Sequence, residues 1–457
     1  MADRHNIQGL VARSYQQDGY LHSRHLMFTF GQQANARGFI ACLLPRVAHA
    51  AMDMAAAPDA VANISLSWSG LGALGVLEPG ADAAFPSDFR EGPEAAITGD
   101  SGSSAPDQWW EGQFRSEQVH LVLHLYGRTG AAADAAVQEV RATAAASGSV
   151  ELIPTRGNTP LAGTSLAPDP RELHFGYLDG FSQPDVDWDD RRDRLGQLDL
   201  RNFLLGYATN DAPSRPHQLP WDEFARDGSY LVLRWLYQDV AAFERYLTDN
   251  AGMVAHLSPA DPRELLAAKM MGRWRDGTPM VLSPDASSPT LAGEAFDYSS
   301  DRDGLRCPFA AHIRIANHRD DPLSHANEVM FGSWKPRVLR RGMSYGPRLQ
   351  GTDDDGIDRG IIGLFFCADI NLQFYPLMRW MRRTSFRDVF EVTGIRRQDP
   401  VTGNRTEASV DRSFVVPATS GDVVLPDLPA FTRTKGTLFL LMPGMKTLAR
   451  LAGPAKG

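Results

Sequence analysis

One histidine has neighbours that suit chemistry as well as packing. His312 lies in the run CPFAAHIRIANHRDD, which spans residues 307–321, directly behind two alanines. The run alternates in the manner of a β-strand, and Arg314 and Arg319 follow the histidine closely. Most histidines on strands fill the core or the surface, but a neutral imidazole can also hold a metal. The residues alone leave both interpretations open.

Two other pairs of side chains are weaker candidates for a site. His120 and His124 share one face of an expected strand, but a metal site needs a third ligand at suitable spacing, and none is visible. A thiol enzyme that uses Cys307 with His312 is disfavoured, because residues five apart on an extended segment point to opposite faces.

The composition indicates a globular protein without a basic surface. The chain has 457 residues, of which 43% are hydrophobic and 22% are charged, and its formal net charge is −9. Because it has no excess of positive charge to neutralise phosphates, we expect no nucleic-acid partner. No apolar run approaches the ~18 residues of a membrane span, and no apolar leader is visible. Three scattered cysteines argue against disulfides and structural zinc, so we expect a cytoplasmic protein without membrane contact.

The elements expected in the first half follow the order β-α-β-β-α-β. Leu121, Leu123 and Leu125 alternate with other residues and would place one face of a strand in the core. An alanine-rich run after that strand has helical spacing. The expected strands cover 26–30, 63–70, 119–127 and 149–154, and the expected helices cover 31–52 and 131–147. This is the order of a split, ferredoxin-like unit with an antiparallel sheet.

The second half repeats this order. The expected strands cover 229–237, 310–316, 360–370 and 436–444, and the expected helices cover 239–250 and 372–383. The fold class is therefore α+β, with two ferredoxin-like units at residues 1–215 and 216–457 and antiparallel sheets. His312 would lie on an inner strand of the second unit. Long loops rich in glycine, proline and aspartate connect the strands and suit a functional site.

Several runs of the sequence, taken in order, resemble one enzyme family. They include LSWSGLGALGV, FGYLDGFSQPDV, GSYLVLRWLYQDVAAFERYL, RCPFAAHIRIANHR and VLRRGMSYGP. From about residue 6 to its C-terminus the chain is similar to the dye-decolorizing peroxidases, most of all to the members with extended loops. The resemblance implies a haem enzyme of two ferredoxin-like units in the dimeric α+β barrel-like superfamily. The chain departs from the family pattern at Ile315 and His318, where a lysine and a proline are usual.

The resemblance implies a haem b whose iron is held by His312. The family commonly uses a carboxylate in a late loop to hold the other ring nitrogen, and Asp399 in the run DPVTG is the candidate. An aspartate that opens an Asp-Pro turn is the alternative role. Arg314 and Arg319 are expected partners of the haem propionates, since a strand would place Arg314 on the face of His312. Both could instead be surface charges, and His318 is the next candidate for the ligand.

The resemblance also implies an acid–base residue and a cation on the distal side. The family's distal aspartate matches Asp179 in the run GYLDGF, where two glycines would let the backbone approach the haem. The distal arginine matches Arg340, with Arg341 as the alternative, and would stabilise charge on the departing oxygen of hydrogen peroxide. Leu364 and Phe366 share one face of an expected strand and would keep the pocket dry, or would simply fill the core.

These residues imply a peroxidase that reduces hydrogen peroxide and oxidises small aromatic donors, such as dyes and phenols, by one-electron steps. Bulky donors would react at surface radical sites, for which Tyr345 and Trp380 are candidates, although helical aromatic residues more often pack in cores. A non-enzymatic haem carrier or sensor on the same fold is the alternative. A carrier needs neither Asp179 nor Arg340, so this pair favours the enzyme. Assembly into a homo-oligomer stays open.

Overall fold

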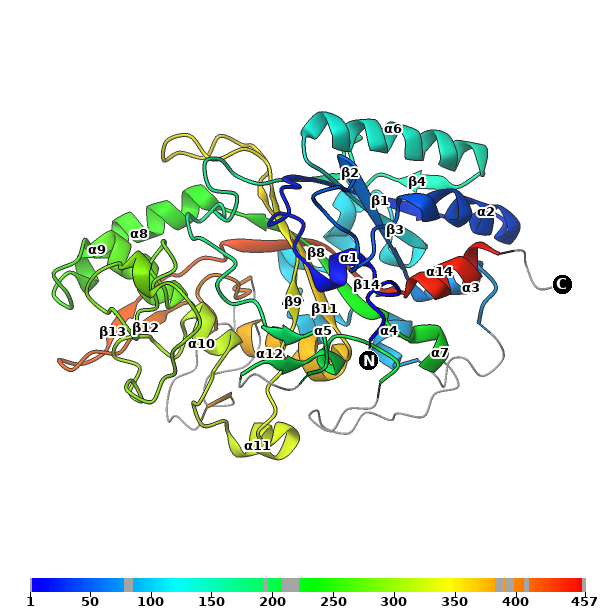
Figure 1. Ribbon diagram of the computed structural model, residues 1–457. Coiled ribbons are helices and arrows are strands. Elements are labelled where there is room, and N and C mark those ends of the chain that lie inside the picture. The colour runs from blue at the N-terminus through cyan, green and yellow to red at the C-terminus, as the bar shows by residue number, and fades with distance from the viewer. Residues whose placement is uncertain are drawn as a thin grey trace.

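Both halves of the chain contribute strands to one antiparallel sheet (Figure 1). The computed structural model describes residues 2–77, 85–191, 196–207, 222–382, 389–390, 398–406 and 411–453. The first half supplies β1 (His22–Thr29), β2 (Ala60–Leu66), β3 (Leu121–Gly127), β4 (Val150–Leu152) and β5 (Leu161–Thr164). The second half supplies β8 (Ser229–Gln238), β9 (Leu339–Arg340), β10 (Met343–Tyr345), β11 (Gly360–Cys367) and β14 (Thr432–Met442). Two small sheets pair β6 (Val186–Asp187) with β7 (Leu198–Asp199) and β12 (Phe414–Val416) with β13 (Val423–Leu425).

Helices pack beside the strands of each half. In Figure 1, α2 (Gln33–Leu43) and α6 (Gly130–Ala146) lie next to the strands of the first half, and α8 (Val240–Val254) and α9 (Pro262–Met271) extend to the opposite end. Thr129 caps α6 with its side chain, which accepts the N–H of Ala132 over 3.1 Å. The other helices are α1 (Gly9–Ala12), α3 (Trp68–Ala73), α4 (Ser87–Glu91), α5 (Ala95–Thr98), α7 (Asp222–Ala225), α10 (His312–Ala316), α11 (His325–Phe331), α12 (Tyr375–Arg382) and α14 (Met445–Ala452).

The order of strands repeats between the halves. Along the sheet the order is β10-β11-β8-β14-β2-β3-β1-β4. Within each half the four strands, counted in chain order, lie as second, third, first and fourth. This is the order of a ferredoxin-like unit, so the expectation of two such units is confirmed. The units join where β14 pairs with β2, with Leu441 opposite Leu66.

The second strand of the second unit is not where the sequence suggested. Residues 312–316 form the short helix α10, and the strand position is taken by β10 with β9 just before it. Ala311 and Ile315 are both fully buried and stand four residues apart, which is helical spacing. A run of five to seven residues is too short for an alternating pattern to be told from a helical one. The placement of His312 on a strand is therefore wrong.

The apolar side chains form two cores, one on each face of the sheet. Leu121, Leu123 and Leu125 belong to one core, and Val122 and Tyr126 belong to the other. This confirms the face predicted for the three leucines. The second core is further enclosed because β5, which pairs with β1, lies against β10.

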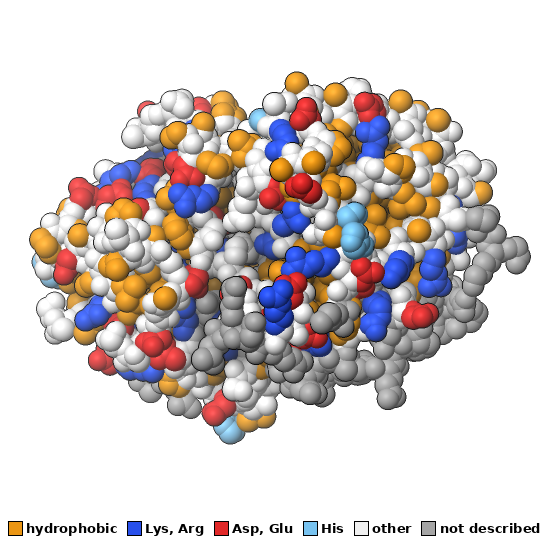
Figure 2. Space-filling model, viewed as in Figure 1, with side chains coloured by type: hydrophobic (Ala, Val, Ile, Leu, Met, Phe, Trp, Pro, Cys, Tyr) orange, Lys and Arg blue, Asp and Glu red, His pale blue; other side chains and the backbone are white. Residues whose placement is uncertain are grey.

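Two further expectations concern the boundary between the units and the absence of a membrane span. The proposed boundary between residues 215 and 216 lies outside the described residues. Among the residues that the structure describes, no helix is both long and apolar enough to cross a membrane. On the face seen in Figure 2, basic and acidic side chains are interspersed, which agrees with the lack of a basic surface in the composition.

Candidate active site

His312 and Asp399 form a hydrogen-bonded pair that joins helix α10 to a late loop. His312 Nδ1 donates to Asp399 Oδ2 over 2.5 Å, and Asp399 is fully buried. The other carboxylate oxygen, Oδ1, accepts the backbone N–H groups of Val401 at 2.8 Å and Thr402 at 3.0 Å. Because Nδ1 carries the proton, the ring keeps the lone pair of Nε2 for a metal.

The charges of this pair stabilise each other against burial. Burial raises the pKa of Asp399, but the charge and hydrogen bond of His312 and two backbone N–H groups lower it, and the net direction is downward. Burial lowers the pKa of His312, but the Asp399 carboxylate raises it, and the net direction is upward. Arg405, which the sequence did not single out, donates to the backbone oxygen of Asp399 over 2.8 Å and adds positive charge here.

Asp179 and Arg340 form a second pair across the two halves of the chain. Arg340 Nη2 donates to Asp179 Oδ1 over 2.9 Å, and both side chains are partly exposed. Gly176 and Gly180 flank the aspartate with φ of 81° and 94°, which glycine adopts readily. A Cβ at Gly176 would lie 2.3 Å from the guanidinium of Arg275, so the loop needs a glycine there.

The two pairs lie close enough for their charges to interact. The charges of Arg340 and Asp179 both influence the pKa of His312, Arg340 lowering it and Asp179 raising it. Burial is the largest influence on that pKa, yet 24% of the His312 side-chain surface is accessible. The sequence-predicted residues His312, Asp399, Asp179 and Arg340 are thus brought together.

The register of the sheet selects between neighbouring residues on β9 and β11. Arg340 lies opposite Phe365, and residues directly opposite in an antiparallel pair share a face. Leu364 and Phe366 therefore point to the other face, where both are buried in the second core. Their expected role as the pocket wall beside Arg340 is not supported, because the side-chain parity is shifted by one residue. Phe365 is the side chain on the face of Arg340.

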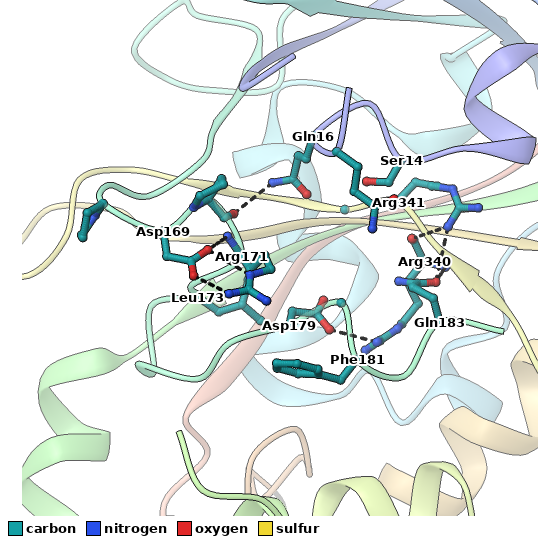
Figure 3. A pocket seen from close by; sticks show the side chains of 15 residues that line it. Ser14, Gln16, Asp169, Arg171, Leu173, Asp179, Phe181, Gln183, Arg340 and Arg341 are labelled. Carbon is teal, nitrogen blue, oxygen red and sulfur yellow. Dashed lines mark hydrogen bonds and ion pairs between the residues drawn. The ribbon is translucent and has the colours of Figure 1, made fainter. Parts of the chain in front are cut away.

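A cavity opens at Asp179 and Arg340 (Figure 3). Its volume is about 710 Å³. Arg341 also lines it, but its guanidinium turns away from Asp179 and donates to the backbone oxygens of Arg340 at 3.0 Å and Val11 at 3.2 Å. Of the two neighbouring arginines, Arg340 is therefore the one paired with the aspartate. The lining residues are Ser14, Gln16, Gln17, Pro168, Asp169, Pro170, Arg171, Leu173, Asp179, Gly180, Phe181, Gln183, Arg340, Arg341 and Gly342.

Arg314 is buried in an ion pair cluster and does not share a face with His312. Its Nε donates to Asp321 over 2.7 Å and its Nη1 to Asp301 over 3.1 Å. On a helix, two residues correspond to a rotation of about 200°, so Arg314 points away from the side of His312. The expectation of a propionate partner on the face of His312 rested on a strand, and we leave Arg314 out of the proposed cofactor site.

Arg319 has an acidic partner, whereas a neighbouring arginine has none. Arg319 Nη2 pairs with Glu294 over 2.5 Å. Arg337 donates to Asn317 Oδ1 over 2.6 Å and to a backbone oxygen over 2.9 Å, and to no carboxylate among the described residues. Burial, followed by the charge of Arg319, lowers the pKa of Arg337 to about 10. Sequence reasoning missed Arg337, whose only signal is the basic run KPR just ahead of Arg340.

His318 lies in the same region but has a different character from His312. Both of its ring nitrogens are buried and lack hydrogen-bond partners within the described ranges. Burial lowers its pKa to about 3, so the ring is neutral. Burial, together with the charge of Arg337, also lowers the pKa of the adjacent Lys335. The like charges of Lys335, Arg337 and Arg319 in this region would favour an anionic group.

Both candidate radical sites are buried, but their surroundings differ. Tyr345 is 8% exposed and belongs to the second core, and its hydroxyl donates over 3.0 Å to Asp358, whose side chain is 44% exposed. Its ring centre lies 6.2 Å from that of Trp235. Trp380 is 3% exposed and packs against His318 inside the molecule. Trp380 is therefore a core residue and not a surface site, because it lies on the buried side of α12.

The alternative sites gain no support from the structure. Cys307 is buried, and burial raises the pKa of its thiol to about 12, which suppresses the thiolate. His124 contacts His25, with 2.9 Å between their Nδ1 atoms, whereas His120 accepts the N–H of Phe30. In the part of the chain that the structure describes, no group of three or more histidine, cysteine or acidic side chains could hold a metal ion.

Comparisons with known proteins point to one family. No family model matches the chain. A dye-decolorizing peroxidase of Exidia glandulosa is 29% identical over 424 residues, which cover 88% of this chain and 78% of that protein. A multifunctional dye peroxidase of an Amycolatopsis strain is 28% identical over 448 residues, which cover 93% and 91%. The solved structure of a dye-decolorizing peroxidase from Auricularia auricula-judae superposes with a TM-score of 0.80 at 25% identity, covering 99% of this chain and 100% of that one.

The named relatives and the solved structures support placing the chain with the dye-decolorizing peroxidases. Dye-decolorizing peroxidases are haem-dependent, so this chain is a haem-dependent peroxidase. Another dye-decolorizing peroxidase, solved with 2,6-dimethoxyphenol, has the same fold, with a TM-score of 0.80 at 24% identity, covering 99% of this chain and 100% of that one.

Proposed function

We propose that this dye-decolorizing peroxidase reduces hydrogen peroxide at a haem b held by His312 and oxidises dyes and phenols by one-electron steps. The observation that carries the proposal is the Asp179–Arg340 ion pair, at 2.9 Å, which lines a cavity and lies close enough to the His312–Asp399 pair for their charges to interact. Relatives named for dye decolorization, and a structural neighbour solved with 2,6-dimethoxyphenol, support the class of donor.

The residues present fit a haem. His312 offers Nε2 to the iron, while Asp399 keeps the proton on Nδ1 and fixes the orientation of the ring. Arg337, which lacks a carboxylate partner among the described residues, and Arg319 supply positive charge for the two propionates. When bound, the haem would supply the iron that reduces peroxide and accepts electrons from the donors.

In the distal pair, Asp179 acts as the base and Arg340 acts as the stabilising cation. Asp179 Oδ1 is held by Arg340, which leaves Oδ2 to accept a proton from one oxygen of hydrogen peroxide and return it to the other. The guanidinium of Arg340 stabilises the negative charge that develops on the departing oxygen. Phe365 lies opposite Arg340 on β11 and adds an apolar surface on this face.

Each half of the chain contributes to this site. The first unit, proposed as residues 1–215, carries Asp179, and the second, proposed as residues 216–457, carries His312 and Arg340. For donors too large to enter the cavity, Tyr345 is the proposed site of electron transfer, with Asp358 placed to accept the phenolic proton.

The same pair favours the enzyme over a haem carrier or sensor. A carrier needs neither a proton acceptor nor a cation where hydrogen peroxide would bind. The two side chains come from segments 161 residues apart and meet at one cavity. Such convergence is expected of a catalytic pair.

A spectrum combined with one substitution tests the proposal. The purified holoprotein should show a Soret band, and Asp179→Asn should keep the haem while its reaction with peroxide slows by about 10²–10⁴-fold. Stopped-flow absorbance measures the rate, and haem content per chain serves as the control. A haem-loaded Asn variant that reacts as fast as the parent would remove Asp179 from the mechanism. A haem-loaded parent that does not react with peroxide would favour the carrier.

A further inference from the structure

The cavity at Asp179 and Arg340 is much larger than hydrogen peroxide requires. Its volume of about 710 Å³ falls within the ~300–1,000 Å³ of small-molecule sites. A molecule the size of water occupies only ~30 Å³. One end of the cavity carries the catalytic pair, and the remainder is lined by other side chains, among them Arg171 and Phe181 (Figure 3). The cavity therefore has room for a donor as well as for peroxide.

Arg171 presents a guanidinium that is already fixed in place. Its Nε and Nη2 donate to the two carboxylate oxygens of Asp169 over 3.1 and 2.7 Å. Its Nη1 has no hydrogen-bond partner among the described residues, and 53% of the side chain is exposed. The bidentate pair orients the group, and the unused N–H groups remain available to an anion in the cavity.

Phe181 provides an aromatic surface next to this guanidinium. The Arg171 guanidinium carbon lies 5.6 Å from the centre of the Phe181 ring. The ring also packs against Gly277, where a Cβ would lie only 2.1 Å from a ring atom. Both neighbours restrict the movement of the ring, and an aromatic ligand can pack against it in an offset or edge-on arrangement.

The charges that line the cavity have a positive surplus. Three arginines, Arg171, Arg340 and Arg341, stand against two aspartates, Asp169 and Asp179. The two aspartates pair with Arg171 and Arg340. Arg341 donates to backbone oxygens and to the Gln183 side chain, and to no carboxylate in the described part of the chain. One positive charge is therefore left uncompensated beside the cavity, which favours an anionic ligand.

We infer that the outer part of this cavity binds aromatic donors with a single negative charge, such as carboxylated phenols. The carboxylate pairs with Arg171, the ring packs against Phe181, and the field of Arg341 adds to the attraction. The inference deepens the proposed function, because it names the donor class of the same site. Arg171 and Phe181 are then specificity-determining residues and not part of the proton chemistry.

Benzoate is a suitable probe, because its binding can be measured without any oxidation. Isothermal titration of the holoenzyme without peroxide should show benzoate binding that weakens about tenfold in Arg171→Gln, the weight of one charge-assisted hydrogen bond. Arg341→Gln should weaken binding as well, and Phe181→Leu should weaken benzoate and neutral benzamide alike. Arg302→Gln is the matched control, because Arg302 is also an exposed arginine paired with an aspartate, Asp320.

Turnover gives a second and separate measure. The ratio of kcat/KM for a carboxylated phenol to that for a neutral phenol of the same size should fall about tenfold in Arg171→Gln and stay unchanged in Arg302→Gln. Equal benzoate affinity in the parent and in Arg171→Gln, Arg341→Gln and Phe181→Leu, or benzamide bound as tightly as benzoate by the parent, would overturn the inference. Because the titration involves no peroxide, failure of the peroxidase proposal would leave the binding result interpretable.

Discussion

At the scale of single residues, the site uses two carboxylates in opposite ways. Asp399 is fully buried and accepts three N–H groups, from His312, Val401 and Thr402. The Asp179 side chain is 37% exposed and pairs with Arg340. A carboxylate that is fully hydrogen-bonded and enclosed serves to orient its partner, whereas one that faces a cavity can exchange a proton.

Replacing His312 by alanine should abolish the retention of haem, because Asp399 holds the His312 ring at Nδ1 and leaves Nε2 available to the iron. The measurement is the ratio of Soret to protein absorbance after gel filtration. His318→Ala is the control and should keep its haem, since His318 is buried beside Trp380. Haem loss from the control and not from His312→Ala would transfer the ligand role to His318.

The choice between the two adjacent arginines can be tested directly. Arg340→Leu should slow the reaction with hydrogen peroxide by about 10²–10³-fold, because it removes a preorganised charge beside Asp179. Arg341→Leu should have a much smaller effect, because its guanidinium turns to backbone oxygens. Stopped-flow rates at saturating haem occupancy decide the matter. The reverse ranking of the two variants would contradict the assignment of Arg340, which rests on its ion pair with Asp179.

At the scale of elements, the sequence predicted the repeated order and missed two local orientations. Alternating leucines in β3 and the alanine-rich helix α6 gave long, clear periods, and both were confirmed. Residues 310–316 are too short a run to distinguish a strand from a helix. Because a strand was expected there, Arg314 was wrongly placed on the same face as His312. On β11, a strand apolar on both faces, the pattern could not decide whether Leu364 or Phe365 faces Arg340.

The site residues were easier to predict than their supports. Motifs identified His312, Asp179 and Arg340, because their neighbours in the chain are distinctive. Arg337 and Arg405 act through contacts made by separate loops, and single arginines carry no local signal of such contacts. Contacts that depend on tertiary packing cannot be predicted from the sequence alone.

The loop that carries Asp179 should depend on a glycine from a different segment. Gly277 has φ of 94°, and a Cβ there would strike the Phe181 ring. Gly277→Ala should lower the free energy of unfolding by about 1–2 kcal/mol through backbone strain. Urea denaturation measures this, with Gly293→Ala as control, since a Cβ at Gly293 meets nothing within 4 Å. Equal stability of the two variants would show that the φ strain at Gly277 is relieved.

At the scale of the whole molecule, the contribution of Asp88 to stability should fall as pH rises from about 4 to about 6. Burial, and then the charge of Asp369, raises the pKa of Asp88 to about 6 from 3.8. Between these values the folded state binds the proton that the unfolded state has lost, so ionisation opposes folding as pH increases. Asp88→Asn should therefore stabilise the protein by about 1–3 kcal/mol at pH 7.5 and by much less near pH 4.

Urea midpoints at the two pH values test this expectation. Asp107→Asn is the control, because Asp107 is exposed. A gain in stability that is the same at both pH values would show that the effect of Asp88→Asn does not come from its ionisation.

The joint between the two units has a consequence for how the active site is reached. Because the fourth strand of the second unit, β14, pairs with the second strand of the first, β2, a pseudo-twofold axis would also pair β4 with β10. That second joint is not made; β5 stands against β10 instead. The cavity is lined by residues 168–171 and 173, shortly after β5, and by residues 340–342, just before β10. The cavity through which small molecules reach the distal pair therefore opens where the twofold symmetry of the two units is broken.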